Sequence, residues 1–267
     1  MRGVAMNLKN VQFEIKGGVA HITLNRPDAA NTMDHATAQE LMQVALACDE
    51  DPGVRAAVLT GAGSVFSAGG DLKSFDAQGD ALPSHLKEVT TYLHAAISRL
   101  VRMQAPLIAS VNGVAAGAGM ALVMAADLAI AAESARFVMA YTRVGLTPDG
   151  SSTYFLPRLV GLRRALELSL TNRMLTAAEA LQWSIVNRVV ADAALATETE
   201  KLAQELAAGP ALAYGATKEL LHRSWNESLE TQMELEARAI AGMGRTADTR
   251  EGIAAFIAKR PAVFQAR

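Results

Sequence analysis

Two glycine-rich turns are the residues of this sequence best suited to chemistry on a carbonyl group. The first is Gly69-Gly70-Asp71, and the second lies within Asn112-Gly113-Val114-Ala115-Ala116-Gly117-Ala118-Gly119. Each follows an apolar run typical of a strand, and small residues leave backbone N–H groups uncovered. Two such donors on one oxygen form an oxyanion hole, which stabilises an enolate or a tetrahedral intermediate. The same glycines would also allow close backbone packing, so the turns alone leave both roles open.

The segment after the second turn is predicted to be a helix over residues 120–126. Such a helix would place the N–H groups of Ala118 and Gly119 at its N-terminus, where the helix dipole favours negative charge. A nucleotide-binding role does not fit, because the glycines do not extend to G-x-G-x-x-G and no Walker lysine follows them.

Asp149 is the second candidate for chemistry. It stands between Thr147-Pro148 and Gly150-Ser151-Ser152, and Pro-Asp-Gly is typical of a turn. An aspartate in this place can cap a following helix, and it can also act as a general base. Local sequence favours the cap, and both roles stay open at this point.

Other nucleophile and metal chemistry is disfavoured. The five histidines show neither an H-x-x-x-H pair nor a cysteine neighbour, so no metal site is predicted. Ser64 and Ser67 lack the G-x-S-x-G pattern of a serine hydrolase. Cys48 lies in an apolar helical pattern and is predicted to be a buried structural thiol.

Composition limits the class of protein. The 267 residues are 51% apolar and 19% charged with a net charge of −2, which favours one large folded domain and disfavours a nucleic-acid partner. The apolar stretch 105–132 is interrupted by Asn112, Asp127 and several glycines, so no membrane span is predicted. Residues 1–9 lack the apolar core of a signal peptide. We therefore expect a soluble, cytoplasmic protein.

The elements that must position the turns alternate between strands and helices. Residues 11–15 and 19–24 predict a hairpin, and Asp34 is predicted to cap a helix that runs to about residue 49. A polar loop is expected at 74–84, a helix at 85–103, and a capping box at Thr176. Further strands are expected at 54–60, 106–111, 128–132 and 137–140.

The chain is expected to divide into a core over residues 1–195 and a helical region over residues 196–267. The helical region carries many apolar side chains, which suggests packing across a subunit interface. Packing of these helices on the core of their own chain is the alternative.

Taken together, these residues resemble the crotonase superfamily of enoyl-CoA hydratases and isomerases. The resemblance covers nearly the whole chain and is carried by motifs in a fixed order: Leu24-Asn25-Arg26-Pro27, Phe66-Ser67-Ala68-Gly69-Gly70-Asp71, Asn112-Gly113 with Gly117-Ala118-Gly119, Pro148-Asp149-Gly150, Leu156-Pro157-Arg158-Leu159-Val160-Gly161 and Lys259-Arg260. It implies an α/β fold, a spiral of β-β-α units with a C-terminal helical trimerisation region. It also implies a homotrimer or a dimer of trimers, and an acyl-CoA thioester substrate with no separate cofactor.

The resemblance implies roles for individual residues. The two oxyanion-hole N–H groups correspond to Gly70 and Ala118. Phe256 and Lys259 correspond to a contact that the neighbouring subunit makes with the coenzyme A head group. The adenine pocket maps to Asp28, Ala29, Ser67 and Ala68, and Asp28 replaces a residue that is often basic in the family.

Other residues are predicted to contact the substrate from the same motifs. Arg26 and Asp71 are counted among the substrate-binding residues. Four side chains are predicted to form the wall of the acyl pocket: Leu72, Met120, Tyr141 and Phe155.

The reaction is predicted from the acids that are present and absent. Typical hydratases of the superfamily hold water with two glutamates, and these would fall at Ala121 and Tyr141, where this sequence has no carboxylate. Asp149 is the acid that remains at a family catalytic position, and it matches isomerases with a single catalytic carboxylate. We therefore predict an enoyl-CoA isomerase of the Δ3,Δ2 type or of the type that acts on ring substrates. Asp149 would move a proton from one carbon to another.

Three alternatives stay open. The chain could be an enoyl-CoA hydratase acting on trans-2-enoyl-CoA, or an enzyme that forms or breaks a carbon–carbon bond in a CoA ester. It could also bind acyl-CoA without turning it over.

Overall fold

The first elements are a hairpin and a capped helix. The structure is a computed structural model that describes residue 6 and residues 8–266, so most of the segment 1–9 used above to judge a signal peptide lies outside it. Strands β1 (Val11–Lys16) and β2 (Val19–Leu24) pair antiparallel, as predicted. Helix α1 (His35–Glu50) follows, and the side chain of its N-cap Asp34 accepts a hydrogen bond from the N–H of Thr37. The predicted cap is therefore confirmed.

The chain then repeats a unit of two strands and a helix, and each unit gives one strand to each of two sheets. In the described part of the chain the larger sheet has the order β1-β2-β3-β5-β7-β10 and the smaller one β4-β6-β8-β9. Strands β2, β3, β5, β7 and β10 run parallel to one another, and so do β4, β6 and β8, whereas β9 pairs antiparallel with β8. The predicted α/β class built from β-β-α units is confirmed. The remaining strands are β3 (Ala56–Gly61), β4 (Val65–Ser67), β5 (Leu107–Val111), β6 (Val114–Ala116), β7 (Leu128–Ala132), β8 (Arg136–Val138), β9 (Leu175–Thr176) and β10 (Arg188–Val190).

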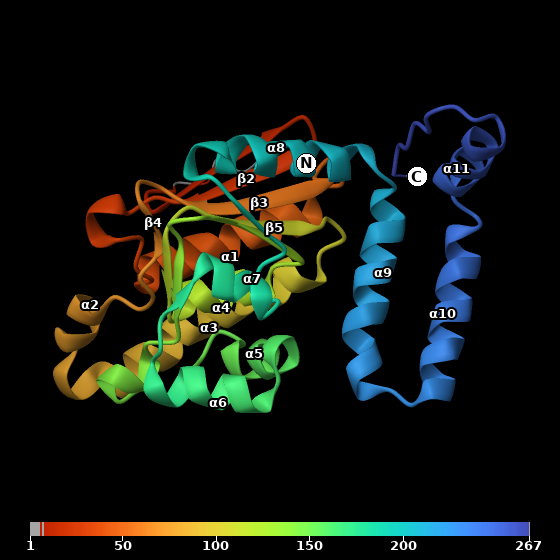
Figure 1. Cartoon of the computed structure of the whole chain (residues 1–267). Coiled ribbons are helices and arrows are strands. Elements are labelled where there is room, and N and C mark those ends of the chain that lie inside the picture. The colour runs from red at the N-terminus through yellow and green to blue at the C-terminus, as the bar shows by residue number, and fades with distance from the viewer. Residues whose placement is uncertain (1–5, 7, 267) are drawn as a thin grey trace.

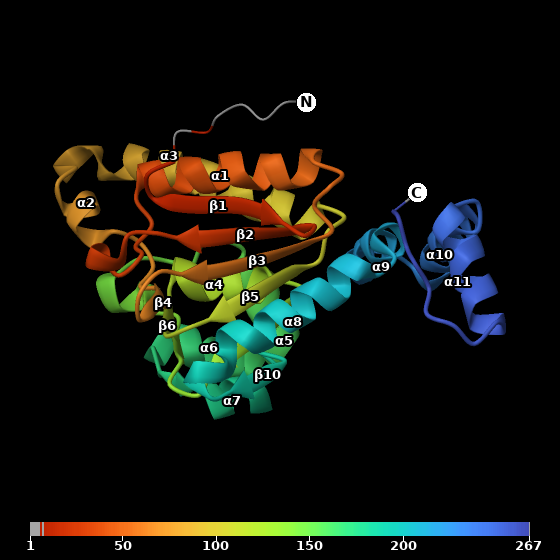
Figure 2. The ribbon, with the colours of Figure 1, turned by 90° about the horizontal axis from the view of Figure 1, so that it is seen from above.

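Helices cover both faces of the larger sheet (Figures 1 and 2). Helices α1, α3 (Leu82–Arg102) and α4 (Ala118–Ala125) pack on one face and form most of the core. Helix α8 (Leu195–Ala208) covers the other face through Ala203 and Ala207. Every residue of α4 is buried, so the second glycine turn opens into the centre of the molecule. The other core helices are α5 (Ser152–Val160), α6 (Leu162–Thr171) and α7 (Ala177–Gln182), the last of which begins at the predicted capping box.

The polar loop predicted at 74–84 is wrong. This segment contains helix α2 (Leu72–Asp76), a 3-10 turn (Gly79–Ala81) and the start of α3. Asp71 caps α2 by accepting a hydrogen bond from the Ser74 N–H, and Pro83 lies in the first turn of α3, where it has no intrahelical N–H to lose. Asp71 and Pro83, residue types that are typical of loops, here lie at the N-termini of helices.

After residue 195 the chain is almost entirely helical, as predicted. Helices α9 (Ala211–Arg223), α10 (Leu229–Met243) and α11 (Ala247–Ile257) stand beside the core (Figure 1). Lys218 of α9 is buried and ties these helices to the core, because its Nζ lies 2.6 Å from Asp127 Oδ2 and donates to the carbonyl of Leu100. Burial lowers the pKa of Lys218, and the Asp127 carboxylate opposes that shift.

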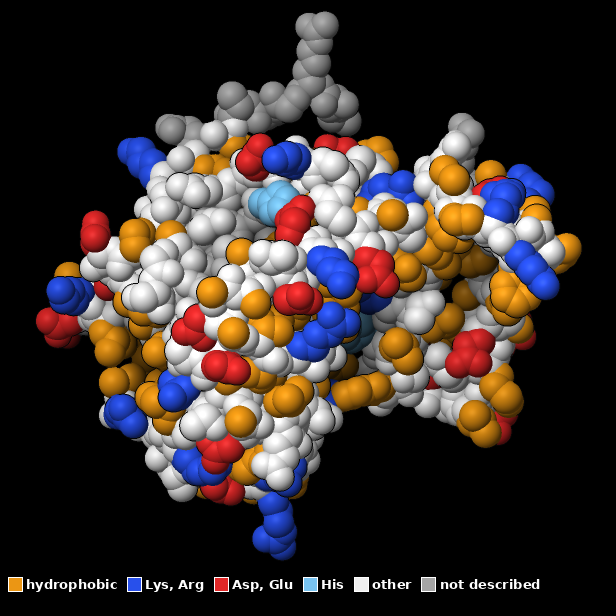
Figure 3. Space-filling model, turned by 45° about the horizontal axis from the view of Figure 1, so that its top comes forward, with side chains coloured by type: hydrophobic (Ala, Val, Ile, Leu, Met, Phe, Trp, Pro, Cys, Tyr) orange, Lys and Arg blue, Asp and Glu red, His pale blue; other side chains and the backbone are white. Residues whose placement is uncertain are grey.

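Helix α10 does not pack on the core of its own chain. Helix α10 has no buried residue among those described, and the C-terminal helices expose many apolar side chains (Figure 3). The alternative of packing on the core of the same chain is therefore wrong for α10. The exposed large side chains here are Leu221, Trp225, Leu229, Met233, Ile240, Ile253, Phe256 and Ile257. Within the described residues, no helix combines the length and the hydropathy that a membrane crossing needs.

Candidate active site

The two glycine turns lie side by side because the strands before them are parallel neighbours. Strand β4 pairs with β6, with Ser67 opposite Ala115, and each turn follows the carboxyl end of its strand. The backbones approach so closely that a Cβ on Gly119 would lie 2.4 Å from the carbonyl oxygen of Ser67. A Cβ on Gly69, whose φ is +93°, would lie 2.9 Å from the carbonyl oxygen of Ala116. The close backbone packing that the glycines allow is therefore present at these turns.

The N–H groups of Gly70 and Ala118 are the two donors that the resemblance assigns to the oxyanion hole. Among the described residues, neither N–H has a hydrogen-bond acceptor. Ala118 is the first residue of α4, whose N-cap Gly117 has a φ of +50°, so its N–H belongs to the unpaired first turn of a helix. Both residues line the same cavity, which allows them to donate to one oxygen there.

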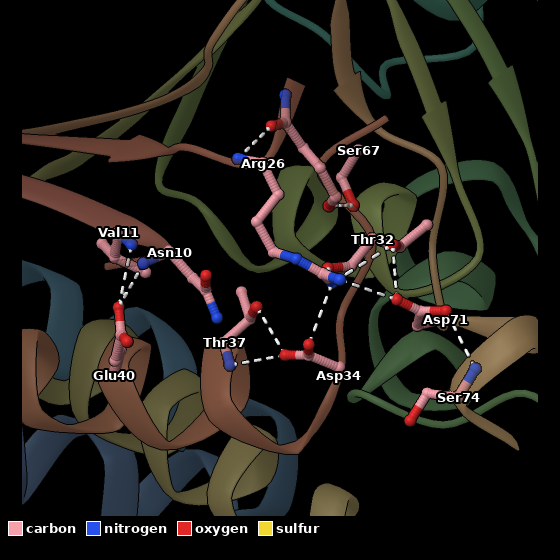
Figure 4. Close-up of polar contacts among 11 residues, drawn as sticks. Asn10, Val11, Arg26, Thr32, Asp34, Thr37, Glu40, Ser67, Asp71 and Ser74 are labelled. Atoms are coloured by element: carbon pink, nitrogen blue, oxygen red, sulfur yellow. Dashed lines mark hydrogen bonds and ion pairs between the residues drawn. The ribbon is translucent and has the colours of Figure 1, made fainter. Parts of the chain in front are cut away.

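The first turn is held by a part-buried network around Asp71 (Figure 4). Asp71 Oδ2 accepts from Nη2 of Arg26 at 2.9 Å and from the Thr32 hydroxyl at 3.2 Å. Nη1 of Arg26 lies 3.2 Å from Asp34 Oδ2, so this guanidinium joins the start of α1 to the turn. Burial raises the pKa of Asp71, but the Ser74 N–H and Arg26 outweigh it, so the net pKa is lowered.

The residues predicted to contact the substrate around this turn divide into two groups. Ser67 is fully buried, and its hydroxyl donates to the carbonyl of Asn31 at 2.8 Å. With Arg26 and Asp71, it forms internal contacts that fix the backbone. Ala68 lines the cavity, whereas Asp28 is exposed and Ala29 half-buried on a 3-10 turn (Pro27–Ala29) outside the cavity lining.

A cavity of about 320 Å³ opens at the two turns. Its walls are mostly apolar, and they come from the turns, from α2 and α3, and from the segment 140–149. Leu72 and Tyr141 line it, as predicted for the acyl pocket. The residues that sequence reasoning did not assign to it include Phe75, Leu86, Val89, Leu93, Val144 and Leu146.

Two of the four predicted wall residues lie elsewhere. Met120 is fully buried in the core, because α4 is covered on all sides. Phe155 lies one turn into α5 and contacts the ring of His222, with 5.9 Å between the ring centroids. Neither residue lines the cavity.

Asp149 is the one carboxylate among the described residues that line the cavity. Its Oδ1 accepts a hydrogen bond from the Tyr141 hydroxyl at 2.6 Å, and its side chain is 26% exposed. It does not cap the next helix, because the N-cap of α5 is Ser151 and that helix has no side-chain cap. The cap favoured by local sequence is therefore wrong, and Asp149 lines the cavity instead.

Tyr141 is suited to hold this carboxylate. Burial and the negative charge of Asp149 raise the pKa of the Tyr141 hydroxyl, so the hydroxyl keeps its proton and stays a donor. The next residue, Gly150, has a φ of +58°, and a Cβ there would lie 3.1 Å from Ala121 Cβ and 3.5 Å from Ile97 Cδ1. Gly150 thus seats the Asp149 turn against α4 and α3.

The two positions where hydratases carry glutamates have different occupants here. Ala121 is fully buried beneath Gly150 and presents only a methyl group. Tyr141 lines the cavity with a hydroxyl already committed to Asp149. Nothing at these positions can supply a second carboxylate.

His94 is a neighbour of Asp149 that sequence reasoning missed. It lies on α3, its Nε2 is 3.7 Å from Asp149 Oδ2, and the same nitrogen accepts a hydrogen bond from the Gly150 N–H at 3.1 Å. In the sequence, the one indication of a role for His94 was its position directly after Leu93, which lines the cavity. Its contact with the Asp149 turn depends on the fold, which brings α3 against that turn.

Phe256 and Lys259 lie far from the cavity within one chain. Phe256 is 86% exposed at the end of α11, and Lys259 is also exposed. In both ribbon views α11 stands at the opposite end of the molecule from α2, which lines the cavity (Figures 1 and 2).

The chain is similar to proteins of one family over nearly its whole length. The family model described as enoyl-CoA hydratase/isomerase matches residues 14–267. The 1,2-epoxyphenylacetyl-CoA isomerase of Escherichia coli (strain K12) is 38% identical over 252 residues, covering 94% of this chain and 96% of that protein. The 4-chlorobenzoyl coenzyme A dehalogenase-1 of an Arthrobacter species is 37% identical over 237 residues, covering 88% and 86%.

Solved structures give the same result for the fold. The crystal structure of an enoyl-CoA hydratase from Bacillus anthracis matches with a TM-score of 0.91 and 31% identity, covering 97% of this chain and all of that one. These three proteins are named for different reactions, so membership of the family does not by itself specify the reaction.

Proposed function

The chain belongs to the enoyl-CoA hydratase/isomerase family, and from this membership we propose that it shifts a carbon–carbon double bond in an enoyl-CoA thioester. The observation that carries the proposal is the single carboxylate of the cavity. Among the described lining residues, Asp149 alone has a carboxylate, which can accept a proton and return it. A double-bond shift needs one such group, because the carboxylate that takes a proton from one carbon can deliver a proton to another carbon.

The mechanism begins at the thioester carbonyl. The N–H groups of Gly70 and Ala118 donate to the carbonyl oxygen and polarise it. Asp149 removes a proton from the carbon next to the double bond, and the electron pair of that C–H bond delocalises into a dienolate. The negative charge on oxygen is stabilised by the two N–H donors and by the N-terminus of α4. The neutral Asp149 then protonates the other end of the dienolate.

Tyr141 contributes by fixing the base. Its hydroxyl holds Oδ1 of Asp149 at 2.6 Å, which leaves Oδ2 for the substrate. A base held in one orientation loses less entropy in the transition state. The apolar walls around the carboxylate fit a hydrocarbon or ring acyl group.

Hydration is less well supported. Addition of water to a double bond needs a held water, a base and an acid. The buried methyl group of Ala121 and the committed hydroxyl of Tyr141 stand where the second carboxylate would be.

Binding of coenzyme A is proposed to involve a second copy of the chain. Phe256 and Lys259 are exposed and remote from the cavity of their own chain, so they would contact the head group in a neighbouring subunit. The apolar side chains exposed on α10 and α11 support a homotrimer or a dimer of trimers. Coenzyme A would enter as part of the substrate, with no separate cofactor.

A panel of CoA thioesters tests the proposal. The purified enzyme is incubated with trans-3-enoyl, trans-2-enoyl and saturated acyl-CoA, and the products are followed by ultraviolet absorbance and mass. We expect trans-3-enoyl-CoA to gain the absorbance of a conjugated thioester with no change in mass. A gain of one water from trans-2-enoyl-CoA without isomerisation would establish a hydratase instead, and cleavage of the acyl chain a lyase. Binding of every thioester with no product would establish an acyl-CoA-binding protein.

A further inference from the structure

His94 lies between Asp149 and solvent. It stands on α3 directly after Leu93, whose side chain lines the cavity, and the His94 side chain is 51% exposed. Asp149 faces the cavity on one side and the His94 ring on the other. His94 itself is not a lining residue, so it can act on a substrate only through Asp149.

The two oxygens of Asp149 have different neighbours. Oδ1 accepts the hydroxyl of Tyr141 at 2.6 Å, and Oδ2 lies 3.7 Å from Nε2 of His94. That nitrogen accepts a hydrogen bond from the Gly150 N–H at 3.1 Å. An imidazole nitrogen that accepts from a backbone N–H carries a lone pair and no proton, so the neutral ring has its proton on Nδ1.

These contacts give His94 a lone pair beside the oxygen that carries the abstracted proton. While Asp149 is ionised, Oδ2 and Nε2 are both acceptors, so no hydrogen bond joins them. Once Oδ2 is protonated, an approach of less than about 1 Å brings O–H and Nε2 within hydrogen-bond distance. The Gly150 N–H keeps the ring in place until then.

We propose that His94 exchanges the proton on Asp149 with solvent during the lifetime of the dienolate, an inference that rests on the proposed function. The O–H bond of Asp149 breaks and an N–H bond forms at Nε2, which gives a carboxylate and an imidazolium. The imidazolium releases the proton on Nε2, which is the one taken from Asp149, to water, since the His94 side chain is 51% exposed. A solvent proton enters by the reverse steps and is delivered by Asp149 to the dienolate. His94 is therefore a positioning residue for the proton, and it acts through Asp149.

The test is the reaction in D2O with trans-3-enoyl-CoA, read by mass spectrometry of the trans-2-enoyl product. His94→Gln is the informative variant, because its amide oxygen can accept the Gly150 N–H but cannot take up a proton. His21→Gln is the matched control. His21 also has its Nε2 3.7 Å from a carboxylate, that of Glu200, but it lies on β2 and does not line the cavity.

We expect the wild-type enzyme and His21→Gln to form a product that carries solvent deuterium. We expect deuterium per molecule of product to fall about tenfold in His94→Gln relative to wild type, with both measured at the same extent of conversion. Equal deuterium contents in wild type and His94→Gln would overturn the inference and leave the proposed function intact. A His94→Gln variant that loses isomerisation but keeps the deuterium content of its residual product would also overturn it, because His94 would then only support the fold of the turn. No isomerisation by the wild-type enzyme would contradict the proposed function itself, and the inference with it.

Discussion

At the scale of single residues, the site depends on how the carboxylate of Asp149 is held. Tyr141 donates to one oxygen, His94 faces the other, and Gly150 fits against α3 and α4 where any side chain would be crowded. Tyr141 lies eight residues before Asp149, whereas His94 lies 56 residues before Gly150. The Pro-Asp-Gly motif could be recognised as a turn from sequence, but its partners could not, because nothing near His94 or Tyr141 in the chain indicates the Asp149 carboxylate.

Removal of the Tyr141 hydroxyl tests how far orientation of the base matters. Tyr141→Phe deletes the donor to Asp149 and keeps the ring in the cavity wall. We expect kcat for isomerisation to fall about 10- to 100-fold with little change in KM, because a hydrogen bond to a charged group contributes about 1.5–3 kcal/mol. Steady-state kinetics on the enoyl-CoA substrate measures both constants, and an unchanged kcat would show that Tyr141 does not orient the base.

At the scale of elements, the site is a consequence of parallel pairing between β4 and β6. Both strands end at the same edge, so the two glycine turns must meet, and glycine is needed where the backbones touch. Helix α4 begins at the second turn and is buried on every side. The sequence predicted the two turns and the helix, whereas their contact required the register of the strands.

A methyl group added at the contact should separate the turns. Gly119→Ala would place a Cβ 2.4 Å from the carbonyl oxygen of Ser67. We expect a loss of about 1–3 kcal/mol in the free energy of unfolding, as for other overpacked cores, together with lower activity. Urea unfolding measures the loss. Gly242→Ala in α10 is the control, because its Cβ would meet nothing within 4 Å, and a loss of equal size there would contradict the packing explanation.

Prediction of elements succeeded where capping signals are local and failed where they resemble loops. The cap at Asp34 and the capping box at Thr176 were predicted and are present. The segment 74–84 was predicted as a loop because of its glycine, proline and polar residues. It is helical because Asp71, held by Arg26, caps α2 and because Pro83 begins α3. A part-buried ion pair between distant residues cannot be deduced from that segment alone.

At the scale of the whole molecule, the core is α/β and the C-terminal helices extend from it. The family resemblance and the β-β-α repeat were predictable from the order of motifs, and the structure and the solved relatives confirm both. The position of α10 and α11 relative to the core was not predictable. Their apolar residues have helical spacing that fits packing on the same chain or on another one equally well.

Glu251 holds the segment 260–263 against α11. Its carboxylate accepts from Arg260 at 2.6 and 2.8 Å and from the Val263 N–H at 3.0 Å. These hydrogen bonds, that to Arg260 first, lower the pKa of Glu251 from 4.5 to about 2. The ionised form is therefore favoured by folding, so this contribution to stability is complete above pH 4.5 and is lost as pH falls towards about 2.

Replacement of Glu251 should remove this part of the pH dependence. We expect Glu251→Gln to be less stable than wild type at neutral pH, and its stability to fall less steeply between pH 4.5 and about 2. Urea unfolding at a series of pH values checks the slope. Glu236→Gln, on α10, should follow the wild-type curve, and parallel curves for wild type and Glu251→Gln would contradict the assignment.

Asp149→Asn removes the base and keeps the shape of the side chain, so it separates proton transfer from substrate binding. The measurement compares isomerisation of trans-3-enoyl-CoA with binding of a saturated acyl-CoA by calorimetry, in wild type and variant. We predict that isomerisation is lost while the Kd for the thioester changes little, since the two N–H donors and the cavity remain. An Asp149→Asn enzyme that isomerises at the wild-type rate would contradict the account.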